Sequence, residues 1–192
     1  MRGFRWLGPP ALVLLGARLL FAESSLEAKL GELKERYERG SETAKDFAIE
    51  ETEANGFLRD TQDLPEGIEN PWTRFEENVA IVGAMVDLDQ VRGDLPDSMI
   101  FQLLSGRVPV EVTIRVSGTQ GEGQLELERV LMSGVELPPS LIDLLASRHD
   151  ASMLLPPGFR LGAPFGLPYD LESIRCQPGS VIVRQRATSP DE

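Results

Sequence analysis

The chain has one histidine, His149, and one cysteine, Cys176, and these are the first side chains to test for catalysis. A Ser-His-Asp triad is assembled in space from distant segments, so the adjacent Ser147 and Asp150 give no support to a catalytic His149. The sequence has no G-x-S-x-G motif to present a nucleophilic serine. Cys176 lies in an alternating segment, where we expect a small buried side chain rather than a reactive thiol. A small hydrolase that uses His149 is the remaining catalytic alternative.

An acidic cluster gives the closest approach to a calcium site, and it comprises Asp87, Asp89, Asp94 and Asp97. An EF-hand loop needs an acid or amide at its fifth position and glycine at its sixth, where this chain has Val91 and Arg92. The aspartates therefore fit a looser calcium site or, as we prefer, turns that end a strand and begin a helix. One histidine and one cysteine are too few for a zinc site. We expect no bound metal and no cofactor.

The glycines between residues 118 and 123 do not form a nucleotide-binding motif. Gly118, Gly121 and Gly123 lack the spacing of a phosphate-binding or dinucleotide-binding loop, and a turn is the better interpretation. No paired acid and base, metal set or nucleophile stands out. This pattern is typical of a binding or structural module, so we predict that the protein is not an enzyme.

Charge restricts the partners of this chain of 192 residues, whose formal net charge is −12. A field of that sign repels nucleic acid and anionic lipid surfaces. We therefore expect no nucleic-acid partner, and any contact with lipid has to come from a local apolar site.

The first 22 residues have the order of a secretory signal peptide. Arg2 and Arg5 precede an apolar run, and Leu20-Phe21-Ala22 places a small residue before Glu23. The run is too short to cross a bilayer of ~30 Å as a helix of about 20 residues. We expect a signal peptide over 1–22, cleavage after Ala22, a periplasmic or other extracytoplasmic location, and no integral membrane span after cleavage. An uncleaved N-terminal anchor is the alternative.

The rest of the chain has the length of a single domain with a polar lead-in. Residues 23–45 predict a polar helix, whose narrow apolar stripe is formed by Leu26, Leu30, Leu33 and Tyr37. We interpret it as a solvated helix that leans on the domain or is partly frayed. Residues 46–186 form the domain, and residues 187–192 are expected to be a disordered tail. With one cysteine there is no internal disulfide, so stability has to come from a core.

The helices of the domain are expected to be short. A helix follows a strand at 45–50, with Thr52 as its N-cap and Glu53 in a favourable position in its first turn. Two further helices are expected at 97–104 and 141–147.

The clearest strand is 108–116, in which valine or isoleucine at every second position alternates with Pro109, Glu111, Thr113 and Arg115. Residues 79–86 are apolar at nearly every position, which predicts a strand covered on both faces. Further strands are expected at 71–76 and 125–132, and a closing hairpin turns at Pro178-Gly179. The sequence therefore predicts an α+β fold with a long, curved antiparallel sheet.

The alternating side chains of 108–116, together with Leu125 and Leu127, supply one apolar face of that sheet. Phe57, Leu58 and the two short helices could cover this face. Full coverage would make a closed core, whereas loose coverage would leave an apolar groove for an acyl chain, in the range of ~300–1,000 Å³ that is typical of ligand pockets. Each buried methylene contributes about 0.8 kcal/mol, so such a chain could bind without a charge contact. Both alternatives remain open at the level of sequence.

Three segments resemble known envelope proteins. The Ala163-Pro164-Phe165-Gly166-Leu167 loop, followed by 171–176 and 179–183, resembles the C-terminal signature of the LmeA-like envelope proteins. Residues 51–58 resemble the helix near the start of those proteins and of the YpmS-like family. The segment Val135-Glu136-Leu137-Pro138 resembles the short segment that precedes the second helix of those proteins.

This resemblance implies a curved sheet wrapped around a long helix, like half of a tubular lipid-binding (TULIP-like) domain. It also implies a place on the outer side of the cytoplasmic membrane and a lipid ligand, because LmeA-like proteins are associated with phospholipid binding and envelope assembly. Those families carry no catalytic motif to transfer. The strong acidity, the expected helix at 97–104 and Pro168 depart from the family pattern.

We therefore expect an exported, non-catalytic bacterial envelope protein that binds a lipid or another long apolar ligand in a groove between sheet and helix. The groove would be lined by Phe57, Leu58, Val110, Val112, Ile114, Leu125, Leu127 and Phe165. The alternative is a structural or adaptor module with a closed core, whose acidic surface or 23–45 helix binds an envelope protein partner.

Overall fold

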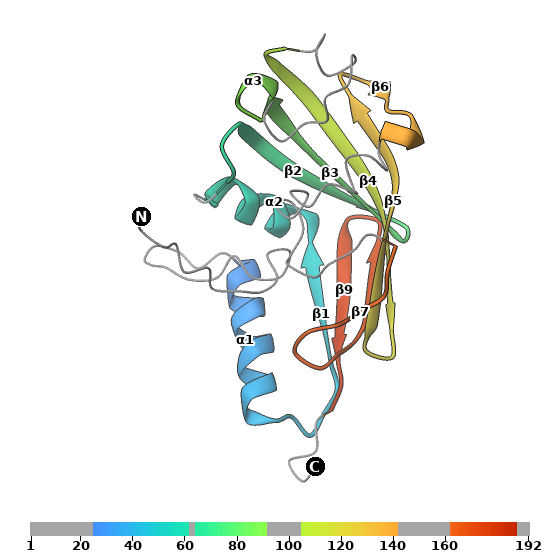
Figure 1. Cartoon of the computed structure of the whole chain (residues 1–192). Coiled ribbons are helices and arrows are strands. Elements are labelled where there is room, and N and C mark those ends of the chain that lie inside the picture. The colour runs from blue at the N-terminus through green and yellow to red at the C-terminus, as the bar shows by residue number, and fades with distance from the viewer. Residues whose placement is uncertain (1–24, 62–63, 92–104, 142–161, 188–192) are drawn as a thin grey trace, which may run out of the picture.

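The computed structural model describes residues 25–61, 64–91, 105–141 and 162–187 (Figure 1). The helices in these ranges are α1 (Ser25–Arg39), α2 (Glu51–Asp60) and α3 (Leu88–Val91). The strands are β1 (Lys45–Glu50), β2 (Ile68–Glu76), β3 (Val79–Asp87), β4 (Arg107–Thr119), β5 (Glu122–Met132), β6 (Val135–Glu136), β7 (Phe165–Gly166), β8 (Leu171–Gln177) and β9 (Ser180–Gln185). The described chain is thus an α+β fold with a large, open, antiparallel sheet of nine strands and few helices.

The sheet has two halves that share the long β4–β5 hairpin. In the β2–β3 half, β2 pairs with β3 and β3 pairs with the first part of β4, as far as Val79 opposite Arg115. In the β8–β9 half, β8 pairs with the end of β4, where Ser117 is opposite Arg175, and β9 and β1 follow outward. β5 pairs along the other edge of β4 and also pairs with β6 and β7. Figure 1 shows β4 and β5 running through both halves, so one face of the sheet is continuous between them.

The two halves meet where the β2–β3 turn touches the β8–β9 turn. The Asn78 N–H donates to the Cys176 carbonyl (3.1 Å), and the Val116 N–H donates to the Asn78 carbonyl (2.9 Å). The Gly179 N–H donates to the Phe75 carbonyl at 3.0 Å. Asn78 and Gly179 have positive φ angles of 59° and 81°, a conformation that asparagine and glycine adopt more readily than other residues. The predicted hairpin turn is therefore also part of the junction between the halves.

Apolar side chains gather in two clusters, one in each half. The buried members of the first cluster, in the β8–β9 half, are Leu33, Phe47, Val116, Leu171, Cys176, Val181 and Val183. The buried members of the second cluster, in the β2–β3 half, are Leu88, Val108, Val130, Met132 and Leu137. α1 contributes Leu33 to the first cluster, and no residue of α1 or α2 belongs to the second. Among the described helices, α1 therefore covers only the β8–β9 half.

Buried polar contacts fix α1 to the sheet. Gln185 of β9 is 1% exposed, and its Nε2 donates to the carbonyls of Leu33 (3.0 Å) and Tyr169 (2.9 Å). Its Oε1 accepts a hydrogen bond from Arg36 Nε at 3.1 Å. Tyr37 meets Tyr169 edge to face, with ring centroids 5.6 Å apart. α1 is therefore an integral part of the fold, whereas the sequence indicated a helix that leans on the domain or frays.

α2 lies along the outer edge of β2 and covers its backbone. Asn55 Oδ1 accepts a hydrogen bond from the Thr73 N–H (2.7 Å), and its Nδ2 donates to the Thr73 carbonyl (2.8 Å). Glu51 Oε2 accepts a hydrogen bond from the Phe75 N–H at 3.0 Å. These bonds replace those of a further strand, so α2 blocks strand pairing at this part of the edge.

The start of α2 differs from the prediction. The predicted N-cap at Thr52 is wrong, because the N-cap is Glu50, which forms a capping box with Glu53. Glu53 lies in the first turn, as predicted, and its Oε2 accepts a hydrogen bond from the Glu50 N–H at 2.9 Å. Glu53 also accepts hydrogen bonds from Lys29 Nζ at 2.7 and 2.6 Å and from the Ser25 hydroxyl. Glu53 therefore joins α2 to α1.

The contacts of Glu53 make its ionisation a source of stability. Burial opposes ionisation, but the hydrogen bonds above and the charge of Lys29 lower the pKa of Glu53 from 4.5 to about 2. The carboxylate is well shielded from solvent, since the Glu53 side chain is 15% exposed. Because the folded-state pKa lies below the unfolded value, ionised Glu53 stabilises the fold above pH 4.5, and this stabilisation is lost as the pH falls toward 2.

We expect Glu53→Gln to lower the free energy of unfolding at pH 7 by about 2 kcal/mol and to flatten its pH dependence in the acid range. Urea unfolding at several pH values between 7 and about 2 measures both effects. Glu35→Gln is the control, because Glu35 forms an exposed ion pair with Arg39 and should change stability by less than about 0.5 kcal/mol. Equal losses in the two variants would contradict the role assigned to Glu53.

The strand predictions agree with the structure to within a few residues. The predicted strand at 45–50 coincides with β1, and those at 71–76, 79–86, 108–116 and 125–132 lie within β2, β3, β4 and β5. In β3 only Ile81 and Gly83 are buried and the other residues are half-buried, so the strand is less covered than its sequence indicated. The Ala163-Pro164-Phe165-Gly166-Leu167 loop contains β7, which pairs with β5.

Several predictions fall outside the described ranges. They are the signal peptide at 1–22, the helix at 97–104, residues 142–147 of the next helix, the side chains of Asp94, Asp97 and His149, and residues 188–192 of the tail. None of the helices in the described ranges is long and apolar enough to cross a membrane.

Candidate functional site

Cys176 is part of the core and is not placed for chemistry. It is 1% exposed within the first cluster, and burial raises the pKa of its thiol to about 11. The neighbouring Arg175 is exposed. The interpretation of Cys176 as a small buried apolar residue is therefore confirmed, because a reactive thiolate needs the opposite environment.

Asp87 and Asp89 hold the turn between β3 and α3. Asp87 Oδ1 accepts a hydrogen bond from the Asp89 N–H (3.1 Å), and its Oδ2 accepts one from Gln90 Nε2 (3.0 Å). Asp89 Oδ2 accepts a hydrogen bond from the Gly106 N–H at 3.0 Å. These are the contacts of turn-forming aspartates. Within the described ranges, no three His, Cys, Asp or Glu side chains lie together as a metal site would require.

The predicted lining residues on β4 and β5 are divided between the two clusters. Ile114 and Leu125 pack against the first cluster. Val110, Val112 and Leu127 pack against the second. Because the long hairpin runs through both halves, one apolar face of β4 serves two different cores.

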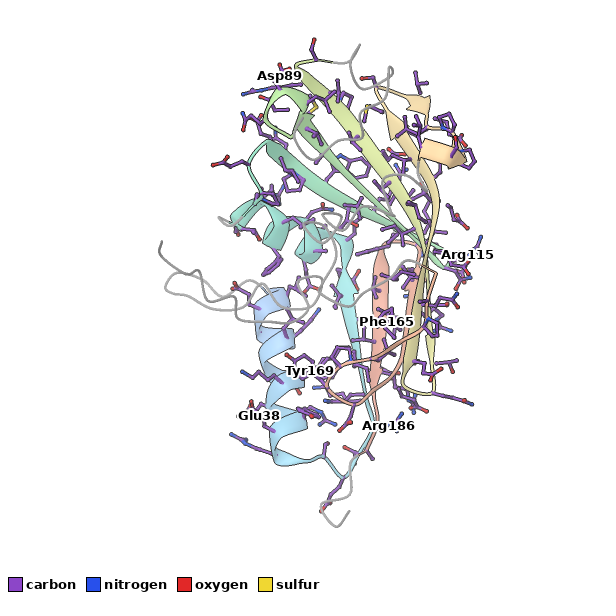
Figure 2. The ribbon with its side chains drawn as sticks, viewed as in Figure 1. Glu38, Asp89, Arg115, Phe165, Tyr169 and Arg186 are labelled. Carbon is purple, nitrogen blue, oxygen red and sulfur yellow. The ribbon has the colours of Figure 1, made fainter. Side chains whose placement is uncertain are left out.

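The other predicted lining residues lie apart from these. Phe57 and Leu58 are half-buried on α2, beside the edge of β2, and belong to neither cluster. Phe165 packs over Gly123 of β5, where its Cζ atom lies 2.8 Å from the place that a Cβ atom would occupy. Figure 2 shows Phe165 in the half of the sheet away from Asp89. The described residues therefore do not bring all eight predicted side chains into one groove.

Together with neighbouring residues of β3 and β4, the second cluster forms a continuous apolar surface across three strands, which we call the β3–β5 patch. At one end of the patch, Ala80 and Ile114 pack against the first cluster. Its rows across β3, β4 and β5 are Ala84-Val110-Met132, Val82-Val112-Val130 and Ala80-Ile114-Leu127, with Val86 opposite Val108 beyond them. Val110, Val112 and Leu127 are half-buried rather than buried. The described residues of this cluster from outside the three strands are Leu88, Leu137 and Leu141.

On the opposite face, Trp72 of β2 lies over Gly83 of β3, its cross-strand neighbour. The ring atoms Cε2 and Cζ2 are 2.3 Å from the place that a Cβ atom of Gly83 would occupy, so only glycine leaves room for this ring position. The Arg74 guanidinium carbon lies 5.9 Å from the ring centroid, within the range of a cation–π interaction.

Trp72 lines two hollows. The first, which we call the α2–β2 groove, has a volume of about 490 Å³ and is lined by Glu51, Thr52, Asn55 and Arg59 of α2 and by residues 71–74 of β2. The second, which we call the Met85 hollow, has a volume of about 270 Å³. Besides Trp72, it is lined by Asn70, Ala84, Met85, Pro109, Val110, Glu111, Leu131 and Gly134. These volumes are close to or within the range of small-ligand sites.

No family model matches the chain, and no curated protein and no solved structure shows significant similarity to it. The chemistry of the site therefore has to be argued from its own residues. In the part of the chain that the structure describes, those residues offer apolar surface, an indole ring, two guanidinium groups and the carboxylates of Glu51 and Glu111. Guanidinium groups donate hydrogen bonds and an indole ring can accept a cation–π contact.

Trp72, Arg59 and Arg74 are not among the site residues predicted from the sequence. A glycine inside the apolar strand 79–86 was a usable signal, because glycine within a strand often marks the close approach of another group. The two arginines line one groove only because α2 packs along β2. No local pattern predicts that contact.

Proposed function

We propose that this chain is an exported, non-catalytic module of the bacterial cell envelope that binds a lipid or another long apolar ligand against its sheet. The observation that carries the proposal is the β3–β5 patch, where three strands present only apolar side chains to one face. Val110, Val112 and Leu127 are only half-buried in this patch. An acyl chain laid on them gains about 0.8 kcal/mol for each methylene that it removes from water.

The TULIP-like form of the fold, a curved sheet wrapped around a helix, is part of this proposal. α1 supports it in the β8–β9 half, where Leu33 packs into the first cluster. In the β2–β3 half, the ligand would lie along the sheet in the place that α1 occupies in the β8–β9 half. The resemblance of 163–167 and 51–58 to LmeA-like and YpmS-like proteins supports the same ligand class, and the signal peptide expected at 1–22 supports the envelope location.

Among the described residues, the structural roles of Cys176 and Asp87 support binding over catalysis by these two side chains. The Cys176 thiol is buried and its pKa is raised to about 11, so it is protonated at neutral pH. Both oxygens of the Asp87 carboxylate accept hydrogen bonds within the β3–α3 turn. These groups have structural roles that leave them unsuited to acid–base or nucleophilic catalysis.

Uptake of a fluorescently labelled phospholipid by the full chain tests the proposal. We expect Val110→Thr combined with Val112→Thr to lower the affinity about tenfold, because two hydroxyl groups then face the acyl chain. Val116→Thr is the matched control. Val116 lies on the same strand but is buried in the first cluster, so this change should cost stability without changing the affinity.

Thermal unfolding of each variant establishes that the protein is folded at the assay temperature. Absence of uptake by the unmodified chain would contradict the proposal and favour an adaptor with a closed core. An equal loss of affinity in Val116→Thr would also contradict it, because the effect would then not come from the β3–β5 patch.

A further inference from the structure

Some polar side chains that line the α2–β2 groove form hydrogen bonds with β2, and others form none with the described residues. Asn55 uses both its oxygen and its nitrogen on Thr73, and Glu51 uses Oε2 on a backbone N–H of β2. Within the described ranges, the Arg59 guanidinium and the Thr52 hydroxyl make no hydrogen bond or ion pair. A guanidinium can only donate, so the groove is suited to a ligand that accepts hydrogen bonds.

Arg74 adds a second guanidinium to the same groove. Its ion pair with Glu76 spans 3.3 Å between Nε and Oε1, and both side chains are about half exposed, at 51% and 55%. Exposed pairs of this kind are worth about 0–1 kcal/mol, so another anion can replace Glu76 at little cost. With Arg59, Arg74 and one carboxylate, Glu51, the lining has an excess of positive charge.

The Met85 hollow begins on the other side of Trp72 and has different chemistry. Met85, Pro109 and Leu131 give it apolar walls, with Asn70 and Glu111 as its polar residues. Among the residues that the structure describes, no arginine or lysine lines it. Because Trp72 lines both hollows, a single ligand can lie across this residue, with its charged end in the groove and its apolar end in the hollow.

We infer that Trp72 marks a binding site for an anionic amphiphile, a carboxylate that carries an acyl chain. The carboxylate accepts hydrogen bonds from Arg59 and Arg74, for which guanidinium groups have matching geometry. The chain crosses the indole ring and lies against Met85 and its apolar neighbours. A protein with a net charge of −12 has no general attraction for anions, so a preference for the carboxylate comes from this local pair of arginines.

This site lies on the face opposite the β3–β5 patch and goes beyond the proposed function. Alternation along β3 and β4 places Met85 and Pro109 on the face opposite the patch, and Ala84 and Val110 of the patch also border the hollow. Arg59 and Arg74 line only the α2–β2 groove, so substitutions of these two residues test the carboxylate site without changing the patch.

Tryptophan fluorescence of the full chain with Trp6→Phe tests the inference. Trp6 and Trp72 are the two tryptophans, so Trp72 is then the single reporter. We expect decanoate to shift the Trp72 emission to shorter wavelength in a saturable way. Decanol, with the same chain and no charge, should bind at least about tenfold more weakly, and acetate should cause no shift.

Substitutions in the same background separate the arginine pair from general electrostatics. Arg59→Gln and Arg74→Gln should each lower the decanoate affinity about tenfold and leave that for decanol unchanged. Arg39→Gln is the matched control, because it removes the same charge from an exposed pair on α1. Equal binding of decanoate and decanol, or an equal effect of Arg39→Gln, would overturn the inference.

The two proposals fail independently. If Trp72 does not respond to decanoate while the full chain still takes up labelled phospholipid, the carboxylate site is wrong and the proposed function stands. If Trp72 responds and phospholipid uptake is absent, the carboxylate site stands alone.

Discussion

Replacement of Gln185 by leucine should lower the free energy of unfolding by about 3 kcal/mol, although leucine is apolar and of similar size. The Gln185 side chain is 1% exposed and makes three hydrogen bonds. Without its amide, the Tyr169 carbonyl loses this donor and Arg36 Nε loses this acceptor, while the Leu33 carbonyl keeps the intrahelical hydrogen bond of α1. Each buried polar group left without a partner costs about 1–3 kcal/mol.

Gln177→Leu is the control for this prediction. Gln177 lies half-buried on the neighbouring strand β8, and its Nε2 donates to the Ser180 hydroxyl at 2.9 Å. We expect a loss of less than about 1 kcal/mol, since the groups left behind can reach water. Urea unfolding measures both variants. Similar losses for Gln177→Leu and Gln185→Leu would contradict the claim that Gln185 is the polar link between α1 and the sheet.

Leu33→Ala should also cost about 3 kcal/mol of unfolding free energy. Leu33 is 4% exposed and is the residue through which α1 enters the first cluster. Its removal leaves a cavity next to Phe47 and Val183, which the rigid strands β1 and β9 can fill only in part.

Leu30→Ala makes the same chemical change on the same helix, where the side chain is only half-buried. We expect a loss of about 1 kcal/mol, and alanine is a good helix former at both positions. Thermal and urea unfolding of the two variants give the comparison. Small and equal losses would mean that α1 only leans on the domain, as its sequence indicated.

These two predictions bear on the adaptor alternative. Because α1 is part of the fold, deletion of residues 23–45 would remove the Leu33 side chain and two of the three hydrogen-bond partners of Gln185, the Leu33 carbonyl and Arg36. A loss of partner binding in such a deletion would then report unfolding. Charge substitutions at the exposed positions Glu35 and Glu38 of α1 test partner binding without this complication.

The strands could be predicted because alternation is a local property of the sequence. The regular spacing in 108–116 lies within β4. The hairpin turn could be predicted because glycine adopts positive φ angles readily, and Gly179 has a φ of 81° in the structure. The sequence also contains a signal for the register shift between β4 and β5. Apolar spacing changes from two to three residues between Leu127 and Val130, and the register shifts between β4 and β5 at that point.

The site could not be predicted, because it depends on contacts between distant segments. The predicted groove assumed that α2 lies across β4 and β5, whereas the bonds of Asn55 to Thr73 hold α2 at the edge of β2. Thr52 is a good N-cap by residue type. The helix begins at Glu51 instead, because β1 leads directly into α2 and Glu53 is held by Lys29 of α1. The burial of Gln185 depends in the same way on distant partners.

Native mass spectrometry of the full chain, purified from the cells in which it is naturally made, tests apolar-ligand binding most directly. We predict a co-purifying lipid that is released on organic extraction, is retained by Val116→Thr, and is reduced or lost when Val110→Thr and Val112→Thr are combined. A mass equal to that of the unliganded chain, together with no uptake of labelled phospholipid, would contradict the assignment of the β3–β5 patch as a ligand-binding surface.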